Sequence, residues 1–330
     1  MPDPFSDIPA QAWVSAVARL LAEPLAAFPN GLSTFSLEVG SVSPQVRIIL
    51  SAGSKTIASD ESQTIVLKPK WNVPGHQLVA KIAEDLLQDE AQDTLRAAML
   101  IIAADPDPKR SQAGDFADYA AWPDTNKSDP VFKKLTGAWH YIDFSYEPDN
   151  PQDYPPPLPP EPHVLSAIRD QIEILRTSAD AEKRAAAFAF VLHLVGDIHQ
   201  PLHCAELRNA DFPNGDRGGN ELVLAHGKNL HSLWDGLLTV LTKDLGGSSS
   251  RLREKYKRTD FATELAKADT SQWAWESHLL ARASYDDILA EPVSVRASKS
   301  YIERALVVAE RQAMLGAYRL SDLLRATLVV

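Results

Sequence analysis

The chain has 330 residues, of which 45% are hydrophobic and 23% are charged, and this composition is typical of a globular protein rather than a disordered one. It carries 33 Lys and Arg residues against 44 Asp and Glu residues, so its formal net charge is -11. That charge excludes a nucleic-acid binder that depends on a broadly basic surface. It does not exclude a phosphate site built around bound metal cations, because such ions carry their own local field.

Residues 1–70 differ in pattern from the rest of the chain. A partly apolar stretch at 10–28 indicates a short amphipathic helix, and its internal charges and proline are unlike the core of a secretion signal. Three β-rich runs follow at 35–39, 46–50 and 64–67, separated by Gly and Ser, which is typical of strands joined by turns. We therefore expect a small α+β appendage without a motif that points to chemistry.

From residue 71 to the end of the chain the pattern is mainly helical. Apolar residues recur at helical spacing from Leu78 to Leu87 and again over 95–103. The pair Asp129-Pro130 favours a helix start, because Asp can cap a helix and Pro fits its first turn. The segment 147–162 contains eight prolines and is predicted to be an extended surface loop.

The C-terminal half continues this helical pattern. No stretch of 18 apolar residues occurs, so we expect no transmembrane helix and no membrane partner. The sequence thus predicts two parts, an appendage over 1–70 and a mainly α domain over 71–330. In the latter part we expect a helix over 180–196, a loop over 211–219, a strand over 221–225, and helices over 229–241, 252–268, 271–290 and 299–327.

Two pairs of potential metal ligands share a spacing of four residues. His193 and Asp197 form one pair and His231 and Asp235 the other, and this spacing places both members on one face of a helix. Imidazole and carboxylate are the ligands that Zn²⁺ accepts in the absence of thiolates, and the single cysteine, Cys204, excludes a disulfide and a thiolate-only site. Because both pairs lie in apolar segments, where unpaired charge is costly, they favour a buried metal centre between helices.

Six short motifs, in order along the chain, resemble those of the zinc-dependent single-strand nucleases of the S1/P1 type and their plant bifunctional relatives. The resemblance covers residues 71 to 235 and is expected to extend to the end of the chain. The motifs are Trp71–His76, Trp122–Asp124, Trp139–Asp143, His193–His203, Gly218–Asn220 and Asn229–Asp235.

The resemblance implies a multi-helix fold of the phospholipase C and nuclease type, with three zinc ions at the bottom of a cleft. Carried over by position, the first zinc would be bound by Asp124, His140, His193 and Asp197. The second would be bound by His203, His231 and Asp235. The third would be bound by His76, by Asp197 as a bridge, and by the amino nitrogen and carbonyl oxygen of Trp71.

The same resemblance implies roles for residues beside the metals. Asp124 would orient the attacking water, and Lys127 and Asn220 would stabilise charge on the phosphoryl group. Tyr141 would stack on a base and Asp143 would contact the base edge, which suits unpaired strands and a weak sequence preference. Of the remaining histidines, His199 is interpreted as structural.

One feature departs from the family pattern. In this family the tryptophan is the mature amino terminus, whereas Trp71 here follows seventy residues and offers a carbonyl but no free amine. Three explanations stay open: cleavage before Trp71, replacement of the amine by another group, or a weak third zinc site.

The sequence thus predicts a monomeric zinc-dependent endonuclease that hydrolyses single-stranded DNA and RNA to 5′-phosphorylated products and has 3′-nucleotidase activity on nucleotides. The alternatives are a zinc phospholipase C-like phosphodiesterase and a zinc-binding protein that has lost catalysis. Family membership implies export to the periplasm or the cell exterior, but the start of the chain shows no signal peptide.

Overall fold

The computed structural model divides into two compact units, Met1–Val66 and Leu67–Val330, which are described separately. The residues that it describes are 34–39, 46–51, 73–110, 114–225, 227–293 and 296–328.

In the first unit, two strands form an antiparallel pair. Strand β1 (Thr34–Val39) pairs with β2 (Val46–Ser51) in a register that sets Thr34 opposite Ser51. Both strands coincide with β-rich runs of the sequence. The predicted helix at 10–28 and the predicted strand at 64–67 lie outside the described residues.

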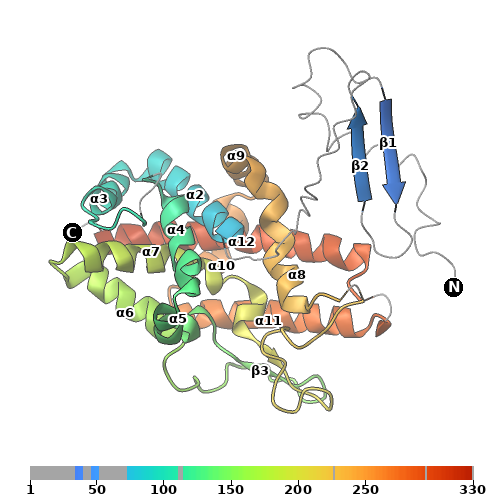
Figure 1. The fold of residues 1–330 in the computed structure, drawn as a ribbon. Helices are drawn as coiled ribbons and strands as arrows, with labels where there is room; N and C mark the ends of the chain where they lie inside the picture. The colour runs from blue at the N-terminus through green and yellow to red at the C-terminus, as the bar shows by residue number, and fades with distance from the viewer. Residues whose placement is uncertain are drawn as a thin grey trace. The chain divides into compact units, whose positions relative to one another are not determined.

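The second unit is mainly helical, as predicted (Figure 1). Short 3₁₀ turns connect its α-helices, and its one described sheet is a two-residue parallel pair, β3 (Ser145–Tyr146) with β4 (Glu206–Leu207). The 3₁₀ helices are η1 (Asn126–Ser128), η2 (Gly137–His140), η3 (Pro201–Cys204), η4 (Leu237–Asp244) and η5 (Arg258–Phe261). The α-helices are α2 (Val73–Glu90), α3 (Gln92–Ala103), α4 (Phe116–Thr125), α5 (Pro130–Thr136), α6 (Val164–Thr177), α7 (Ala181–Asp197), α8 (Leu230–Gly236), α9 (Leu245–Lys255), α10 (Ala262–Leu265), α11 (Thr270–Leu289) and α12 (Lys299–Leu328).

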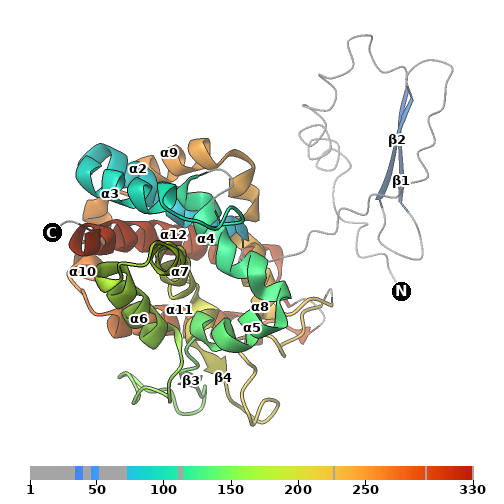
Figure 2. The same cartoon turned by 60° about the vertical axis from the view of Figure 1, so that its left-hand side comes forward.

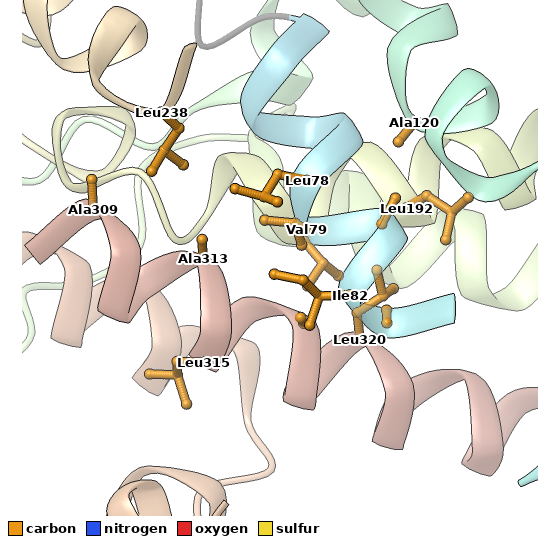
Figure 3. Close-up of a cluster of buried hydrophobic side chains, with 14 of the residues drawn as sticks. Leu78, Val79, Ile82, Ala120, Leu192, Leu238, Ala309, Ala313, Leu315 and Leu320 are labelled. Carbon is orange, nitrogen blue, oxygen red and sulfur yellow. The ribbon is translucent and has the colours of Figure 1, made fainter. Parts of the chain in front are cut away.

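Helix α7 lies at the centre of this unit, packed against α2, α4, α6 and α12 (Figure 2). Every residue from Ala187 to Asp197 is buried, so this helix is covered on all sides rather than along one stripe. Around it, apolar side chains of α2 such as Val79 and Ile82 face Ala313 and Leu320 of α12 (Figure 3). A helix enclosed in this way fixes the position of the histidine and the aspartate at its C-terminal end.

Side-chain caps explain where several helices begin. Asp129 accepts a hydrogen bond from the backbone N–H of Val131 at 2.8 Å, with Pro130 in the first turn, and this confirms the predicted start of α5. At the start of α7, the Asp180 carboxylate accepts from two backbone N–H groups. The Asn229 side chain accepts from Ser232 N at 2.7 Å and starts α8.

Three predicted elements are wrong in their type or extent. The helix predicted over 229–241 is α-helical only to Gly236 and continues as the 3₁₀ helix η4. Residues 221–225 form no strand, although the buried Leu222 and Leu224 alternate with exposed residues; a single bridge joins Val223 to Asn229. The predicted helix over 252–268 is interrupted after Lys255, because the Asp260 carboxylate accepts from Lys257 N at 2.8 Å and starts a separate 3₁₀ turn.

The segment 147–162 has neither helix nor strand and is mostly exposed, as its proline content predicts. Within the described ranges, each helix falls short of the length or the apolar character that a bilayer span requires.

Candidate metal centre

The carboxylate of Asp197, the last residue of α7, is contacted by imidazoles from four elements. His140 Nδ1 lies 2.9 Å from Oδ2, and His203 Nδ1 lies 2.9 Å from Oδ1. His193, one turn earlier on α7, has Nε2 3.1 Å from Oδ2, and His76 of α2 has Nε2 3.4 Å from Oδ1. All five side chains are buried. Segments distant in sequence therefore converge on one carboxylate.

Two overlapping groups of donors share His193 of α7. His76, His193 and Asp197 present ligand atoms that all lie within 4.8 Å of one another, and so do Asp124, His140 and His193. The rings of His76 and His193 stack with centroids 3.6 Å apart, while His193 Nε2 lies 3.0 Å from His140 Nδ1. Nitrogen and oxygen donors thus crowd into one small volume.

A third group of donors includes His203, whose Nδ1 contacts Asp197 Oδ1. His203, His231 and Asp235 also present ligand atoms within 4.8 Å of one another. His231 Nε2 is 3.5 Å and His203 Nε2 is 3.7 Å from the Asp235 carboxylate, and the two imidazole rings stack. The three groups together contain every predicted His and Asp ligand.

Backbone carbonyls orient two of the imidazoles. His193 Nδ1 donates to the carbonyl of Ala120 at 2.8 Å, and His231 Nδ1 donates to that of Gly218 at 2.7 Å. Since a carbonyl only accepts, the proton of each neutral ring is on Nδ1. The lone pair of Nε2 therefore points into the centre, which is the arrangement found for histidines that bind metal.

Two buried atoms of the centre are left without a hydrogen bond. Within the described part of the chain, neither Asp124 Oδ2 nor His140 Nε2 has a hydrogen-bond partner. Buried polar atoms nearly always have one, so each needs a further ligand. The donors are imidazoles and carboxylates only, because the buried Cys204 donates its thiol to the carbonyl of Ile198 instead. A borderline metal cation such as zinc fits this donor set.

The electrostatics of the centre lead to the same conclusion. Burial alone would raise the pKa of Asp124, but His193 and Lys127 offset it and hold that pKa at about 2. Burial lowers the pKa of His140 to about 4, so this ring is neutral. At His203 burial opposes protonation, but the Asp197 carboxylate raises the pKa to about 10. The raised pKa of His203 reports the negative field of Asp197, and a bound cation would meet this field in place of the proton on His203.

A cavity of about 280 Å³ gives access to this centre. His140, His203 and His231 contribute to its wall, as do the residues that the sequence analysis assigned to catalysis and base binding: Lys127, Tyr141, Asp143 and Asn220.

Each of these four residues has a distinct environment. Lys127 Nζ lies 2.5 Å from Asp124 Oδ1, so this lysine is tied to a predicted metal ligand. The Tyr141 side chain is 43% exposed, which leaves a ring surface free for stacking. Burial and the nearby Glu206 raise the pKa of Asp143 to about 6. The exposed Asn220 donates from Nδ2 to the backbone carbonyl of Arg217.

Two residues of α11 without a predicted role donate hydrogen bonds to the backbone next to Asp197 and His203. Ser277 Oγ donates to the Ile198 carbonyl at 2.6 Å, and His278 Nδ1 donates to the Cys204 carbonyl at 3.2 Å. No sequence signal identifies these residues, because they belong to α11, some eighty positions away.

His199 points away from the centre, in agreement with its structural interpretation. Its Nδ1 donates to the Val195 carbonyl at 2.7 Å, and its Nε2 accepts from the buried Arg319 guanidinium at 3.0 Å. Trp71, the remaining predicted ligand, lies outside the described residues.

Comparison with known proteins adds independent information. Residues 71–329 match the model of the S1/P1 nuclease family. Nuclease S1 of Aspergillus oryzae is 29% identical over 208 residues, which cover 61% of this chain and 64% of the relative. Endonuclease 5 of Arabidopsis thaliana is 28% identical over 181 residues, 51% of this chain and 56% of the relative. Nuclease P1 of Penicillium citrinum is 26% identical over 195 residues, 57% of this chain and 65% of the relative.

The chain thus spans between half and two thirds of the length of these relatives. The family match begins at the residue where the sequence pattern changes from β-rich to helical, and it covers every described residue of the metal centre. The resemblance inferred from the six motifs is confirmed: the chain belongs to the S1/P1 nuclease family.

Proposed function

We propose that residues 71–330 form a monomeric zinc-dependent phosphodiesterase that cleaves single-stranded DNA and RNA to 5′-phosphorylated products, with 3′-nucleotidase activity. The observation that carries this proposal is the convergence of three buried His and Asp groups beside one open cavity. The known relatives named nucleases and endonucleases support the reaction class. Residues 1–70 are proposed to be a separate appendage.

The proposed ligands follow the sequence-based assignment. Bound zinc supplies Lewis-acid chemistry, because it activates water near neutral pH and offsets charge on a phosphoryl group. Asp197 would contribute to both the first site and the His76 site, because His140 contacts its Oδ2 and His76 contacts its Oδ1. Trp71 is proposed to add its carbonyl to the His76 site. The proposed ligand sets are Asp124, His140, His193 and Asp197; His203, His231 and Asp235; and His76 with Asp197 and Trp71.

The chain's own residues then have clear tasks. Asp124 holds Lys127 at 2.5 Å through Oδ1, and as a proposed zinc ligand beside the cavity it would also orient the attacking water. The Lys127 ammonium and the Asn220 side chain line the same cavity, where they can donate to phosphoryl oxygens as negative charge develops.

Tyr141 and Asp143 are proposed to bind the base. An exposed aromatic ring stacks on any unpaired base, which favours single strands without strong sequence selection. At neutral pH the Asp143 carboxylate accepts hydrogen bonds from amino or imino groups of a base edge, and it lines the same cavity as the ring.

Removal and return of the metal tests the proposal. The purified protein is treated with EDTA, and zinc is then added back to samples that contain a single-stranded oligonucleotide, a 3′-mononucleotide or phosphatidylcholine vesicles. We expect hydrolysis of the first two substrates to disappear and return with zinc. Activity that survives complete chelation would contradict the mechanism.

Two other outcomes identify the alternatives. Hydrolysis of phosphatidylcholine in preference to the oligonucleotide indicates a phospholipase, and stoichiometric zinc without turnover of any substrate indicates a binding protein. The amino-terminal sequence of the active protein shows whether the Trp71 amine is free.

A further inference from the structure

Two cationic side chains line the cavity beside the metal centre and remain without a salt bridge. Lys133 lies on α5, and Arg217 lies on the turn before Gly218. Across the described ranges neither has an acidic partner within salt-bridge distance, whereas the third cation of the cavity, Lys127, is paired with Asp124. In a chain of net charge -11, two unpaired cations at the same opening form a local positive field.

The turn that carries Arg217 is fixed to the metal centre by its backbone. The carbonyl of Gly218 accepts from His231 Nδ1 at 2.7 Å, and the carbonyl of Gly219 accepts from His231 N at 3.2 Å. Just before the turn, the buried Asp216 accepts from Leu207 N at 2.8 Å. The base of the Arg217 side chain therefore has a defined position relative to one predicted zinc ligand.

Arg217 also adopts a backbone conformation that arginine rarely takes. Its φ is 58°, in the left-handed region, where a side chain other than Gly, Asn or Asp is uncommon. The hydrogen bonds that build the turn use the Arg217 backbone carbonyl, which accepts from Asn220, and none of them uses its guanidinium. The strain is thus not explained by the turn itself, and such outliers gather at ligand-binding positions.

We propose that Lys133 and Arg217 form a second phosphate site, which binds a backbone phosphate next to the one being cleaved. This inference rests on the proposed function, which places the scissile phosphate at the metal centre of the same cavity. A guanidinium presents a planar fork of donors that matches phosphate oxygens, and an ammonium adds a compact charge. The site accordingly selects substrates with more than one phosphate.

The same two cations argue against a choline phospholipid as substrate. A quaternary ammonium head group is recognised by aromatic faces, and nearby positive charges repel it. A polynucleotide places further phosphates at the opening, and these match the unpaired charges of Lys133 and Arg217.

Two substrates of different phosphate number test the proposal on the zinc-loaded full chain. Lys133→Gln, Arg217→Gln and the double variant are compared with the native protein on 3′-adenosine monophosphate and on a short single-stranded oligonucleotide. We expect the double variant to raise KM for the oligonucleotide by about tenfold or more, with a much smaller rise for the mononucleotide and little change in kcat. The matched control is Lys134→Gln, an exposed neighbour on α5 that does not line the cavity.

A direct binding measurement provides the second readout. Fluorescence anisotropy of a labelled single-stranded oligonucleotide gives Kd at several salt concentrations, for the zinc-loaded protein and after chelation. Because each neutralised phosphate on a single strand contributes about 0.7 to the slope of log K against log salt, and the two cations bind one phosphate, the double variant should lose about 0.7. Equal slopes and equal Kd values for the native protein and the double variant would overturn the proposal.

The two measurements also separate this inference from the proposed function. If the native protein hydrolyses neither substrate, the proposed function fails and the anisotropy alone decides whether the phosphate site exists. If both substrates lose affinity equally, Lys133 and Arg217 contact the scissile phosphate, and the second site is rejected.

Discussion

The two sides of the metal centre differ in how deeply they are enclosed. In the inner part, His76, His193 and Asp197 are each no more than 1% exposed. His193 and Asp197 lie in the buried C-terminal stretch of α7, and His76 lies on α2, which packs against it. On the other side, the His231 side chain is 19% exposed and is carried by α8, a helix of seven residues beside a glycine turn. The centre therefore has an inner part, where ligands are shared between groups, and an outer part that is more open to substrate.

The largest effect is expected from breaking the inner part at Asp197. Asp197→Asn removes the charge that four imidazoles face and weakens both inner groups. We expect loss of at least two metal ions by elemental analysis. We also expect hydrolysis to fall by about 10³-fold or more, since loss of a single oriented donor already costs about 10²–10³. Asp170→Asn, at an exposed carboxylate on α6, is the control. Retention of full metal content by Asp197→Asn would show that the carboxylate isn't shared.

A smaller effect is expected from the outer part. His231→Gln removes a ligand that only the outer group uses, so the variant should lose a single metal ion and keep the inner ones. Graded dialysis of the native protein against a weak chelator, followed by elemental analysis, should release the outer ion first, because its ligands are more accessible. Hydrolysis is expected to fall by about 10–100-fold or more. Simultaneous release of all metal ions would remove the proposed distinction between the two parts.

The inner and outer parts also differ in how much of them could be predicted from the sequence. The pairs His193/Asp197 and His231/Asp235 follow from helical spacing, and α7 and the start of α5 were predicted for the same local reasons. The contact of His76 with Asp197 depends on the packing of α2 against α7, which spacing alone does not show.

The hydrogen bonds from α11 to the backbone around the metal centre could not be predicted from the sequence either. Ser277 and His278 act through backbone carbonyls, which every residue carries, so no side-chain pattern marks their targets. The predicted strand at 221–225 was wrong because alternation of buried and exposed residues also occurs where only a single bridge forms. The predictions for Asp124, Lys127 and Tyr141 came from the family resemblance, not from local periodicity.

The free energy of unfolding is expected to depend on pH through His278, which donates to the Cys204 carbonyl beside the outer part. Burial lowers the pKa of His278 to about 4, below its usual 6.5, so the folded protein holds it neutral while the unfolded chain takes up a proton. Its contribution is therefore fully favourable above pH 6.5 and is lost as pH falls towards 4. Between pH 7 and pH 5 this loss amounts to about 2 kcal/mol.

The test is a comparison of unfolding free energies. His278→Asn keeps a donor for the Cys204 carbonyl but does not titrate, so its stability should fall about 2 kcal/mol less than that of the native protein over this range. Denaturant unfolding at both pH values measures it, and metal release affects both proteins alike. Identical pH dependence would mean that His278 is not kept neutral.

The smallest effect concerns the backbone strain of the outer part. Arg217→Gly removes a left-handed non-glycine residue, which costs about 1–2 kcal/mol, but adds flexibility to the unfolded chain worth about 0.5–1 kcal/mol. A net gain of about 0.5–1 kcal/mol in unfolding free energy is expected. Ala297, with a φ of 69°, is strained in the same way but does not line the cavity, so Ala297→Gly is a matched control. Both variants should gain stability, and only Arg217→Gly should bind a single-stranded oligonucleotide more weakly. Because the two changes relieve the same kind of strain, weaker binding by Arg217→Gly alone assigns the Arg217 side chain to substrate recognition, and equal binding by both variants would contradict that role.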